Sequence, residues 1–464
     1  MEGTPSLDIL KGGSLVVGGS APMPLNHLVI KEDFYSNQFG FGQLLNSSPA
    51  MTANSVTLSM YCDGNRWYFI SMPCDVKLSN IKNVDDASFV FRYYDGESRA
   101  ANGTGSSWKD VPVDGTLQAG RAYIYQTDRN STIEFTLDVT GIEGLLASGH
   151  RTVPVNAWTS ENPANAGWNL IGNPSLTYFD MASTSLTCPI TVWDSYNRRY
   201  VAYSLIDDDV VLYPTQAFFM QQIGENGEIT FDAKGRQLTS EVSRPAAVAA
   251  AGIARRVIFN LELVVAGDAS SDRTRIVLND DASLDYECGR DASKFFADGG
   301  EVVEFFTMDG SGNRLAINER PEGDCRVRLG LYAPGASTLT ISAPRLDGEA
   351  VLHDAVTGRY VDLRKENSYT FDVDSRGFVL DRFSITVRKP TSGIGEITGE
   401  DDMKVAVDGN ILTVVGVKGL PVIVYALDGR VAAVADSCET HSFTLPAGMY
   451  VVKAGKTAVK CIIR

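Results

Sequence analysis

The sequence predicts an all-β protein built from several tandem antiparallel domains of the β-sandwich type, with an internal duplication in its N-terminal part. Apolar and polar residues alternate over short windows along most of the chain, and a period of two is typical of strands with one buried face. Asp-Gly, Asn-Gly and Gly-Gly pairs separate these windows, and such pairs accept the positive φ angles of tight hairpin turns. A repeated set of sequence anchors indicates the duplication.

Length and charge limit the class of protein. A chain of 464 residues exceeds the roughly 250 residues at which a single core stops growing, so we expect two to four domains. The formal net charge of -16 argues against a nucleic-acid surface, because phosphate binding requires clustered Lys and Arg. Without a run of about 18 apolar residues, no transmembrane segment is expected.

The N-terminal half divides into a leading segment and a duplicated unit. Residues 1–60 are expected to form a β segment that is either truncated or packed on the next unit. Residues 61–243 form the duplicated β-sandwich unit, with one repeat near 66–135 and the other near 167–231. The best helical signal, Asp138–Ala147, lies between the repeats and is weakened by two glycines.

Two anchors define the repeat. A Trp-x-apolar-Ile-small-x-Pro pattern begins at Trp67 and again at Trp168. A second anchor, Leu followed by an Ala-aromatic strand, begins at Leu117 and again at Leu212. Each repeat also carries a strand that ends in an aspartate-containing turn between its anchors. Because order and spacing both match, the repeats are expected to pack as one duplicated β unit.

The remaining chain follows the same reasoning. An Ala-rich stretch with Pro and Gly at 244–252 is either a linker or a short helix. Residues 256–388 suit one β-sandwich. Residues 389–402 are rich in Gly, Pro and acids and predict a linker. Residues 403–464, with about seven short strands, are expected to form a small C-terminal β-sandwich.

Cysteines and acidic turns give few signals for metal binding. The seven cysteines include no Cys-x-x-Cys pair with zinc spacing, and possible disulfide partners are Cys62 with Cys74, Cys288 with Cys325 and Cys438 with Cys461. The densest acidic turn, Asp207-Asp208-Asp209, is the candidate site for a structural calcium ion, with a solvated loop as the alternative. The segment from Asp309 to Asn313 imitates half of a calcium loop but is better explained as a hairpin turn. No other cofactor is expected.

Tryptophans are candidates for contacts with a ligand. Aromatic rings offer a large contact area with a polar edge, which suits sugar stacking. Trp67 and Trp168 occupy equivalent strand positions and are therefore expected in the core. Trp108 and Trp158 lie in polar, loop-like contexts and are the better candidate ligand-binding residues.

The C-terminal residues carry a family resemblance. The strand from Val422 ends at Asp428-Gly429-Arg430, and a later strand reads Leu445-Pro-Ala-Gly-Met-Tyr-Val-Val-Lys453. This pattern resembles the type A sorting domains of the type IX secretion system in Bacteroidota. The Trp-containing anchors and the Arg92–Ala100 run are similar to stretches of Bacteroidota cell-surface proteins described as adhesins. The resemblance implies export, with the C-terminal domain as the partner of the export machinery.

Catalytic motifs are absent from the sequence. The chain has no Gly-x-Ser-x-Gly motif, and each of its four histidines is isolated in the sequence. We therefore expect a non-enzymatic protein, secreted or on the outer cell surface, that binds a glycan or protein ligand in adhesion. The alternative is a structural stalk that presents other domains. An exported hydrolase is less favoured because catalytic motifs are missing, although paired carboxylates from distant strands would leave no local signature.

Overall fold

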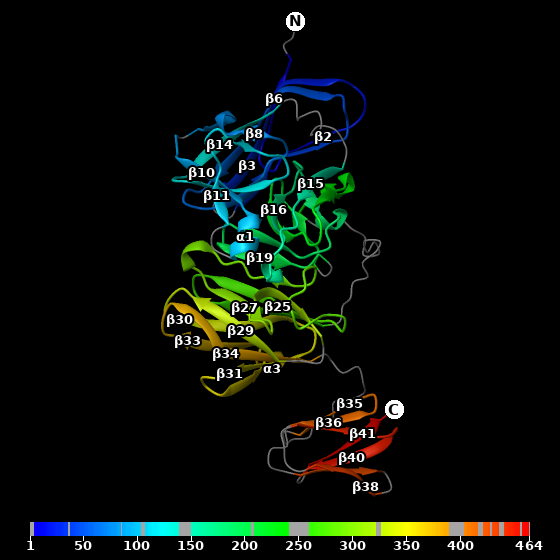
Figure 1. Ribbon diagram of the computed structural model, residues 1–464. Coiled ribbons are helices and arrows are strands. Elements are labelled where there is room, and N and C mark those ends of the chain that lie inside the picture. Colours follow the sequence, from blue (N-terminus) through cyan, green and yellow to red (C-terminus); the bar gives the residue numbers. More distant parts are fainter. Residues whose placement is uncertain are drawn as a thin grey trace. The chain divides into compact units, whose positions relative to one another are not determined.

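The computed structural model confirms the all-β fold (Figure 1). It describes residues 4–35, 38–84, 86–103, 107–138, 150–205, 208–240, 259–321, 326–388, 403–415, 421–426, 429–435, 440–454 and 457–463. The chain separates into two compact units, Met1–Arg388 and Lys389–Arg464. The α-helices within the described ranges are short, namely α1 (Gly96–Asn102) and α3 (Leu363–Glu366). The 3-10 turns are η1 (Leu78–Asn80), η2 (Pro163–Asn165), η3 (Met181–Ser183), η4 (Ala233–Gly235) and η5 (Asp298–Gly300).

The N-terminal strands share a sheet with strands of the first repeat. The strand order is β1-β3-β6-β14-β9, and β4 also pairs with β3. The strands are β1 (Ser6–Ile9), β3 (Met23–Tyr35), β4 (Gln38–Phe41), β6 (Met51–Cys62), β9 (Ile81–Asn83) and β14 (Ser131–Leu137), with β2 (Ser14–Val17) and β5 (Gln43–Asn46) as a separate pair. The pairs β1–β3, β3–β6 and β2–β5 are parallel, unlike most pairs of the chain. A parallel pair needs a crossover, and β4 and β5 lie in the crossover from β3 to β6.

The two repeats form sheets of the same topology. In repeat 1 the order is β11-β10-β13-β7, and in repeat 2 it is β19-β18-β21-β16. Repeat 1 contains β7 (Tyr68–Ser71), β8 (Val76–Lys77), β10 (Phe89–Tyr94), β11 (Trp108–Asp110), β12 (Thr116–Leu117) and β13 (Ala122–Thr127). Repeat 2 contains β15 (Arg151–Val155), β16 (Trp168–Gly172), β17 (Tyr178–Asp180), β18 (Ile190–Asp194), β19 (Arg199–Tyr203), β20 (Val211–Leu212), β21 (Ala217–Gln221), β22 (Gly227–Phe231) and β23 (Arg236–Gln237). The duplication predicted from the anchors is confirmed.

The strand registers fix which residues are equivalent. Ser71 pairs with Ala122 in repeat 1, and Gly172 pairs with Ala217 in repeat 2. The short strand pairs β8–β12 and β17–β20 are also equivalent. The first strand of each pair is followed by a 3-10 turn, η1 after β8 and η3 after β17. Outer strands repeat as well, because β6 pairs with β14 as β15 pairs with β22. Each repeat is thus a complete supersecondary unit, as expected for a duplicated fold.

The repeats contact each other reciprocally. Ile70 of repeat 1 forms an antiparallel bridge with Gln216 of repeat 2, and the equivalent Ile171 forms one with Arg121. Hydrogen bonds follow the same exchange, from Ser71 N to the Thr215 carbonyl and from Gly172 N to the Gly120 carbonyl. Each repeat therefore contacts the other through the same two positions, and the roles are exchanged between the repeats. This reciprocal pattern indicates an approximate twofold axis between them.

Equivalent aromatic positions from both repeats form one core at this interface. The pairs of equivalent residues are Trp67 and Trp168, Phe69 and Leu170, Tyr94 and Trp193, Trp108 and Tyr200, and Ile124 and Phe219. Phe295, from outside the repeats, stacks on Phe219 with the ring centroids 4.4 Å apart. Trp168 is buried and Trp67 half-buried, so both lie in or against the core, as their strand positions predicted.

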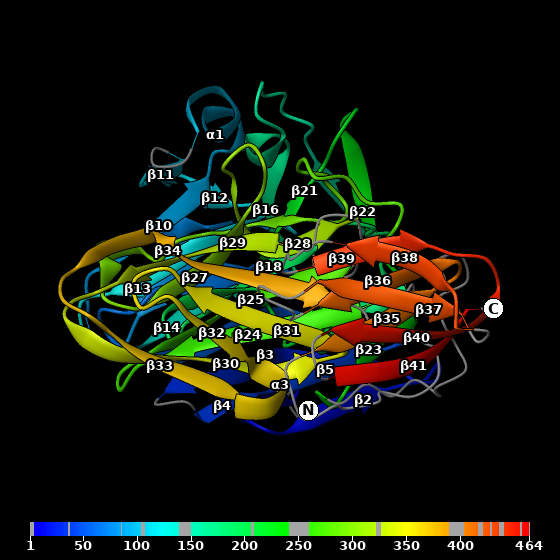
Figure 2. The same ribbon diagram turned by 90° about the horizontal axis from the view of Figure 1, so that it is seen from below.

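Residues 259–388 form a single large sheet that folds around one core. The strand order is β32-β31-β34-β29-β27-β28-β25-β24-β30-β33, and β26 also pairs with β28. Figure 2 shows strands of this sheet from below. The strands are β24 (Phe259–Ala266), β25 (Ser271–Leu278), β26 (Ala292–Ser293), β27 (Glu304–Met308), β28 (Arg314–Arg320), β29 (Arg326–Ala333), β30 (Ser337–Leu346), β31 (Glu349–Asp354), β32 (Arg359–Asp362), β33 (Ser368–Val373) and β34 (Gly377–Arg388). The two end strands, β32 and β33, are consecutive in the chain and are joined by α3, which contacts both. Asp309 to Asn313 form the hairpin turn between β27 and β28, as predicted.

The C-terminal unit consists of two antiparallel sheets with their own core. One sheet has the order β35-β36-β39 and the other β38-β37-β40-β41. The strands are β35 (Lys404–Asp408), β36 (Ile411–Val415), β37 (Val422–Ala426), β38 (Val431–Ala435), β39 (Thr440–Thr444), β40 (Gly448–Ala454) and β41 (Thr457–Ile463). Leu412, Val424 and Val452 are fully buried in this core.

Several sequence predictions concern residues outside the described ranges. These are the helical signal after Asp138, the Ala-rich stretch at 244–252 and the linker at 389–402. Cys62, Cys74, Cys188, Cys288 and Cys461 are free thiols. A Cys62–Cys74 disulfide is therefore not formed, since each thiol is buried within a hydrophobic core. Cys325 and Cys438, named in the other two pairs, lie outside the described residues.

Candidate functional site

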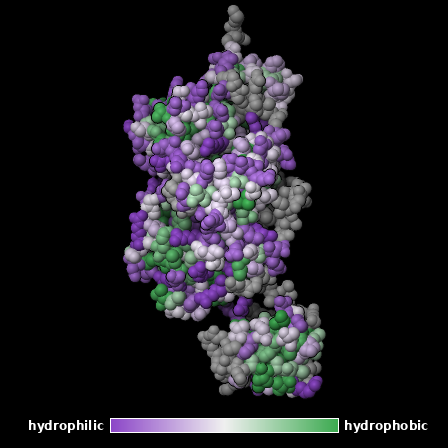
Figure 3. Space-filling view, viewed as in Figure 1, coloured by the Kyte–Doolittle hydropathy of each residue, from purple (hydrophilic) through white to green (hydrophobic). Residues whose placement is uncertain are grey.

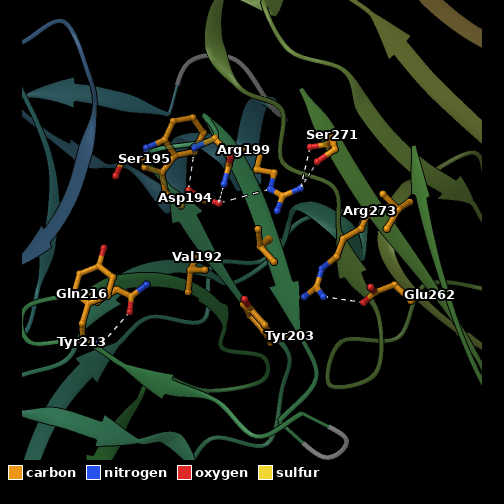
Figure 4. Close-up of a pocket in the computed structure, with 14 residues that line it drawn as sticks. Val192, Asp194, Ser195, Arg199, Tyr203, Tyr213, Gln216, Glu262, Ser271 and Arg273 are labelled. Carbon is orange, nitrogen blue, oxygen red and sulfur yellow. Dashed lines mark hydrogen bonds and ion pairs between the residues drawn. The ribbon is translucent and has the colours of Figure 1, made fainter. Parts of the chain in front are cut away.

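A polar pocket lies between repeat 2 and the sheet that follows it. The β18–β19 hairpin forms one wall and strands β24 and β25 form the other (Figure 4). The cavity has a volume of about 510 Å³, within the range of small-ligand sites. The side chains that carry its chemistry are Asp194, Ser195, Arg199, Tyr203, Gln216, Glu262, Ser271 and Arg273.

The β18–β19 turn positions Asp194. Its Oδ1 accepts a hydrogen bond from Asn197 N at 3.0 Å and its Oδ2 one from Asn197 Nδ2 at 2.6 Å. The equivalent Asp95 of repeat 1 accepts from Ser98 N at 3.0 Å and Ser98 Oγ at 2.8 Å. Both repeats therefore use an aspartate to cap the turn after this strand, in agreement with the turns expected between the anchors.

Arg199 bridges the two walls of the pocket. It pairs with Asp194 across the hairpin, Nε to Oδ2 at 3.7 Å. Its Nη1 donates to the Ser271 carbonyl at 2.9 Å and to Ser271 Oγ at 3.1 Å. Figure 4 shows the guanidinium extended from β19 toward β25. A planar group fixed by contacts at both ends is already in place before any ligand binds.

Arg273 makes a second bridge in the opposite direction. From β25 its Nη1 contacts Glu262 Oε2 at 2.8 Å and its Nη2 donates to the Ala202 carbonyl at 3.0 Å. The guanidinium lies over the Tyr203 ring, 4.9 Å from the centroid. Burial raises the pKa of Tyr203, so its phenol stays protonated at neutral pH and can donate a hydrogen bond.

Both carboxylates of the pocket are engaged by arginines. Asp194 is directed at Arg199 and Glu262 at Arg273 (Figure 4). Pairs of this kind neutralise the site and leave hydroxyl, amide and guanidinium edges for polar contacts. Gln216 is also fixed, because its side-chain oxygen accepts from Tyr213 N at 3.0 Å. The arrangement suits an uncharged ligand that both donates and accepts hydrogen bonds.

The two tryptophans predicted to contact a ligand lie elsewhere. Trp108 is half-buried in β11 against the aromatic core, with its ring centroid 5.1 Å from that of Tyr94 and 5.8 Å from that of Phe69. Trp158 is half-buried against the start of α1, where any side chain at Gly96 would collide with its ring. Packing explains both positions, and their role in ligand binding stays a prediction.

The predicted calcium site is only partly described. Asp207 lies outside the described residues and Asp209 is exposed. Asp208 accepts from Ser204 N at 2.8 Å and pairs with Arg275 at 2.6 Å. A guanidinium thus contacts an oxygen that calcium would need. Over the described ranges, no three His, Cys, Asp or Glu side chains are grouped as a metal site.

Sequence reasoning did not find the pocket residues. Asp194 stood out only as part of a turn, and no local pattern connects Arg199 with a serine 72 residues further along the chain. The strand-turn-strand signal was present, but the partner wall depends on how repeat 2 packs on the next sheet. Long-range packing of this kind leaves no periodic trace in the sequence.

The C-terminal unit has an apolar outer surface, which we call the outer face. It lies on the sheet β38-β37-β40-β41 and includes Val431, Val434, Met449 and Ile462, each at least 38% exposed. Figure 3 shows hydrophobic side chains gathered over β38 and β40. The exposed apolar area on this side of the sheet makes the outer face a candidate interaction surface.

Comparison with known proteins adds little to this geometry. No family model matches the chain. No curated protein matches it. One solved structure with some similarity is described as "Biofilm associated protein - BSP domain"; it is 9% identical, and the alignment covers 86% of this chain and 67% of that chain with a TM-score of 0.13. This score does not establish a shared fold. No helix of the described ranges is long and apolar enough to cross a membrane.

Proposed function

We propose that this protein is a non-catalytic binding protein of the cell exterior, secreted or held at the outer surface, that acts in adhesion. The observation that carries the proposal is the pocket between repeat 2 and strands β24 and β25, bridged by Arg199 and Arg273. Its polar groups are fixed by neighbours on both walls. A fixed site loses little conformational entropy on binding, which favours recognition.

The ligand proposed for this pocket is a glycan. Sugar hydroxyls donate and accept hydrogen bonds at once, and the pocket offers donors on Arg199, Arg273 and Tyr203 beside acceptors on Asp194 and Glu262. Neutralised ion pairs favour an uncharged polar ligand over a strongly charged one. A protein ligand would need a broad apolar patch, which fits the outer face of the C-terminal unit better than this cavity.

A hydrolase is less well supported by the same residues. Glycoside hydrolysis requires one carboxyl group that gives a proton and a second that attacks or activates water. Asp194 and Glu262 are each paired with an arginine, so neither carboxyl group faces the cavity alone, as the proton donor of such a reaction would. A pure stalk would leave a preorganised pocket without a role. Binding therefore accounts for more of the site than catalysis or presentation does.

A separate role is proposed for residues 403–464, namely export or surface attachment. Its support is the resemblance to sorting domains, the independent core and the apolar outer face. Lys453 and Lys460 lie on the same side of β40 and β41 as Val451, so the face combines apolar area with positive charge. The export machinery is the expected partner.

A glycan array probed with the full chain tests the ligand proposal. Arg199→Ala removes the bridge to Ser271 and is expected to weaken binding of the selected glycan at least about tenfold, roughly 1.4 kcal/mol. Arg359→Ala is the matched control, because it removes an exposed ion pair with Glu366 at 2.6 Å outside the pocket. No binding by folded wild-type protein to any glycan, or equal loss in the control, would contradict the proposal.

Surface display in the native host tests the C-terminal role. Met449→Lys places a charge on the outer face and is expected to abolish display while the protein stays folded. Ile411→Lys is the control, since Ile411 is similarly exposed but lies in the other sheet of the unit. Normal display of Met449→Lys would refute the role of this face.

A further inference from the structure

A buried lysine lies between two buried carboxylates in the sheet of residues 259–388. Lys294 follows β26, Asp272 belongs to β25 and Glu304 begins β27. The Lys294 Nζ atom is 2.7 Å from Asp272 Oδ2 and 2.7 Å from Glu304 Oε2. All three side chains are at most 2% exposed. The proposed glycan pocket does not use any of them.

Backbone N–H groups donate hydrogen bonds to both carboxylates, and the Lys294 amine lies close to each of them. Asp272 Oδ2 accepts from Phe305 N at 2.6 Å, and Glu304 Oε1 accepts from Ala297 N at 2.7 Å. The other carboxylate oxygen of Asp272, Oδ1, is buried and has no hydrogen-bond partner. The Lys294 amine thus lies at contact distance from both carboxyl groups, in a site that excludes water.

Apolar groups surround this cluster. Phe305 and Phe306 of β27 are fully buried, and the Phe296 ring lies 5.8 Å from Nζ. Burial raises the pKa of Glu304, so this carboxyl takes up a proton more readily than an exposed one. Because the amine is buried with both carboxyl groups, these groups are the nearest acceptors for a proton that the amine gives up.

We propose that Lys294 and Asp272 join in an intramolecular amide bond, with Glu304 as the group that transfers protons. The Lys294 ammonium gives one proton to Asp272, which becomes a neutral acid. The Nζ lone pair then attacks Asp272 Cγ and forms the C–N bond, while Glu304 accepts the second proton from Nζ. Glu304 returns that proton to the departing hydroxyl, the C–O bond breaks and one water leaves. Oxidation states do not change, and no co-reactant is needed.

The site favours this reaction over hydrolysis. Groups held at contact distance react as if at effective concentrations of about 10⁵ M or more, which offsets the ordinary preference for hydrolysis in water. Exclusion of water from the apolar surroundings acts in the same direction. The product ties β25 to the segment before β27 and converts residues 272–294 into a closed ring.

Intact mass spectrometry of the full chain tests the proposal. The folded wild-type protein is expected to be lighter than its sequence by the mass of one water molecule. Lys294→Met, Asp272→Ala and Glu304→Gln are each expected to restore the full sequence mass. Lys234→Arg is the control and keeps the deficit, because Lys234 forms an exposed ion pair with Asp232.

Peptide mapping locates the bond without depending on any variant. Trypsin cannot cleave after an acylated lysine, so residues 257–273 are expected to appear covalently joined to residues 291–314. Wild-type protein of full sequence mass that is cleaved after Lys294, even after long incubation in the folded state, would overturn the proposal. A mass deficit that persists in Lys294→Met would overturn the assignment of the amine.

Discussion

The Thr215 hydroxyl donates a hydrogen bond of 3.3 Å to Oε2 of the buried Glu32, which joins repeat 2 to the N-terminal sheet. Thr215 has a φ of 60°, a left-handed conformation that a β-branched residue rarely adopts. Its equivalent in repeat 1 is Gly120, with a φ of 74°. Repeat 2 thus has a strained backbone at a position where repeat 1 has glycine. The threonine at this position supplies the hydroxyl group that binds Glu32 Oε2.

Glu32→Gln tests the protonation of this site. Burial raises the pKa of Glu32 from 4.5 to about 8. The folded protein therefore binds the Glu32 proton more tightly than the unfolded chain does. The stabilisation that comes from this tighter proton binding is fully present below pH 4.5 and is lost as the pH rises through 8. At about 1.4 kcal/mol per pH unit, the loss amounts to at most about 5 kcal/mol.

Urea unfolding at several pH values between 4.5 and 8 measures the effect. The difference in free energy of unfolding between Glu32→Gln and wild type should grow in favour of the variant as the pH rises. The exposed Glu225→Gln is the control and should show a constant difference. Parallel curves for Glu32→Gln and wild type would show that Glu32 is ionised in the folded protein.

Ser71 and Gly172 are equivalent residues that face each other across the approximate twofold axis. A Cβ atom on Gly172 would lie 2.3 Å from Ser71 Cβ, so only one of the two positions can carry a side chain. Gly172→Ser is therefore expected to lower the free energy of unfolding by about 1–3 kcal/mol through overpacking. The added Cβ would also lie 2.9 Å from the Gln216 carbonyl oxygen, so the double variant Ser71→Gly with Gly172→Ser should recover the part of the loss that comes from Ser71, as a double-mutant cycle would measure. Additive losses would argue against contact at the axis.

Arg99 is buried between two aromatic rings. Its guanidinium lies 4.9 Å from the Trp168 ring centroid and 4.5 Å from that of Phe295, and Nη1 donates to the Tyr94 hydroxyl at 3.0 Å. Arg99→Ala should cost about 3 kcal/mol in unfolding free energy, because it empties a packed space between the rings. Arg92→Ala removes an exposed guanidinium over Trp67 and should cost less than about 1 kcal/mol. Similar losses for both would contradict the role of burial.

The two compact units should fold separately. Residues 1–388 expressed alone are expected to unfold within a few degrees of the main transition of the full chain, because each unit has its own core. Calorimetry of residues 1–388, of residues 403–464 and of the full chain makes the comparison. Aggregation of the longer piece, or a single shared transition that neither piece reproduces, would refute independence.

Strand content and duplication could be predicted because both leave local marks. Alternation and Asp-Gly turns give the strands, and the Trp67 and Trp168 anchors mark β7 and β16. Helix α1 was missed, although Asp95 followed by Ser98 is an N-cap signal, because seven residues show little helical periodicity.

The sites could not be predicted for a different reason. Arg199 meets Ser271, and Lys294 meets Asp272 and Glu304, only after distant strands pair. Nothing in a short sequence window distinguishes a buried lysine from an exposed one when acids are abundant nearby. Trp108 has polar neighbours in the sequence, yet it packs against the aromatic core. Its local sequence therefore did not indicate its burial.

The approximate twofold axis has a consequence for how the repeats could diverge. In a dimer of identical chains, every substitution near the axis is made twice, and a change that suits one side is imposed on the other. Fusion of the two copies in one chain removes that constraint. Gly120 and Thr215 are equivalent positions that carry different residues, as are Ser71 and Gly172. Repeat 2 is then free to contact Glu32 of the N-terminal sheet through Thr215 and to supply the β18–β19 wall of the polar pocket, with no matching change in repeat 1.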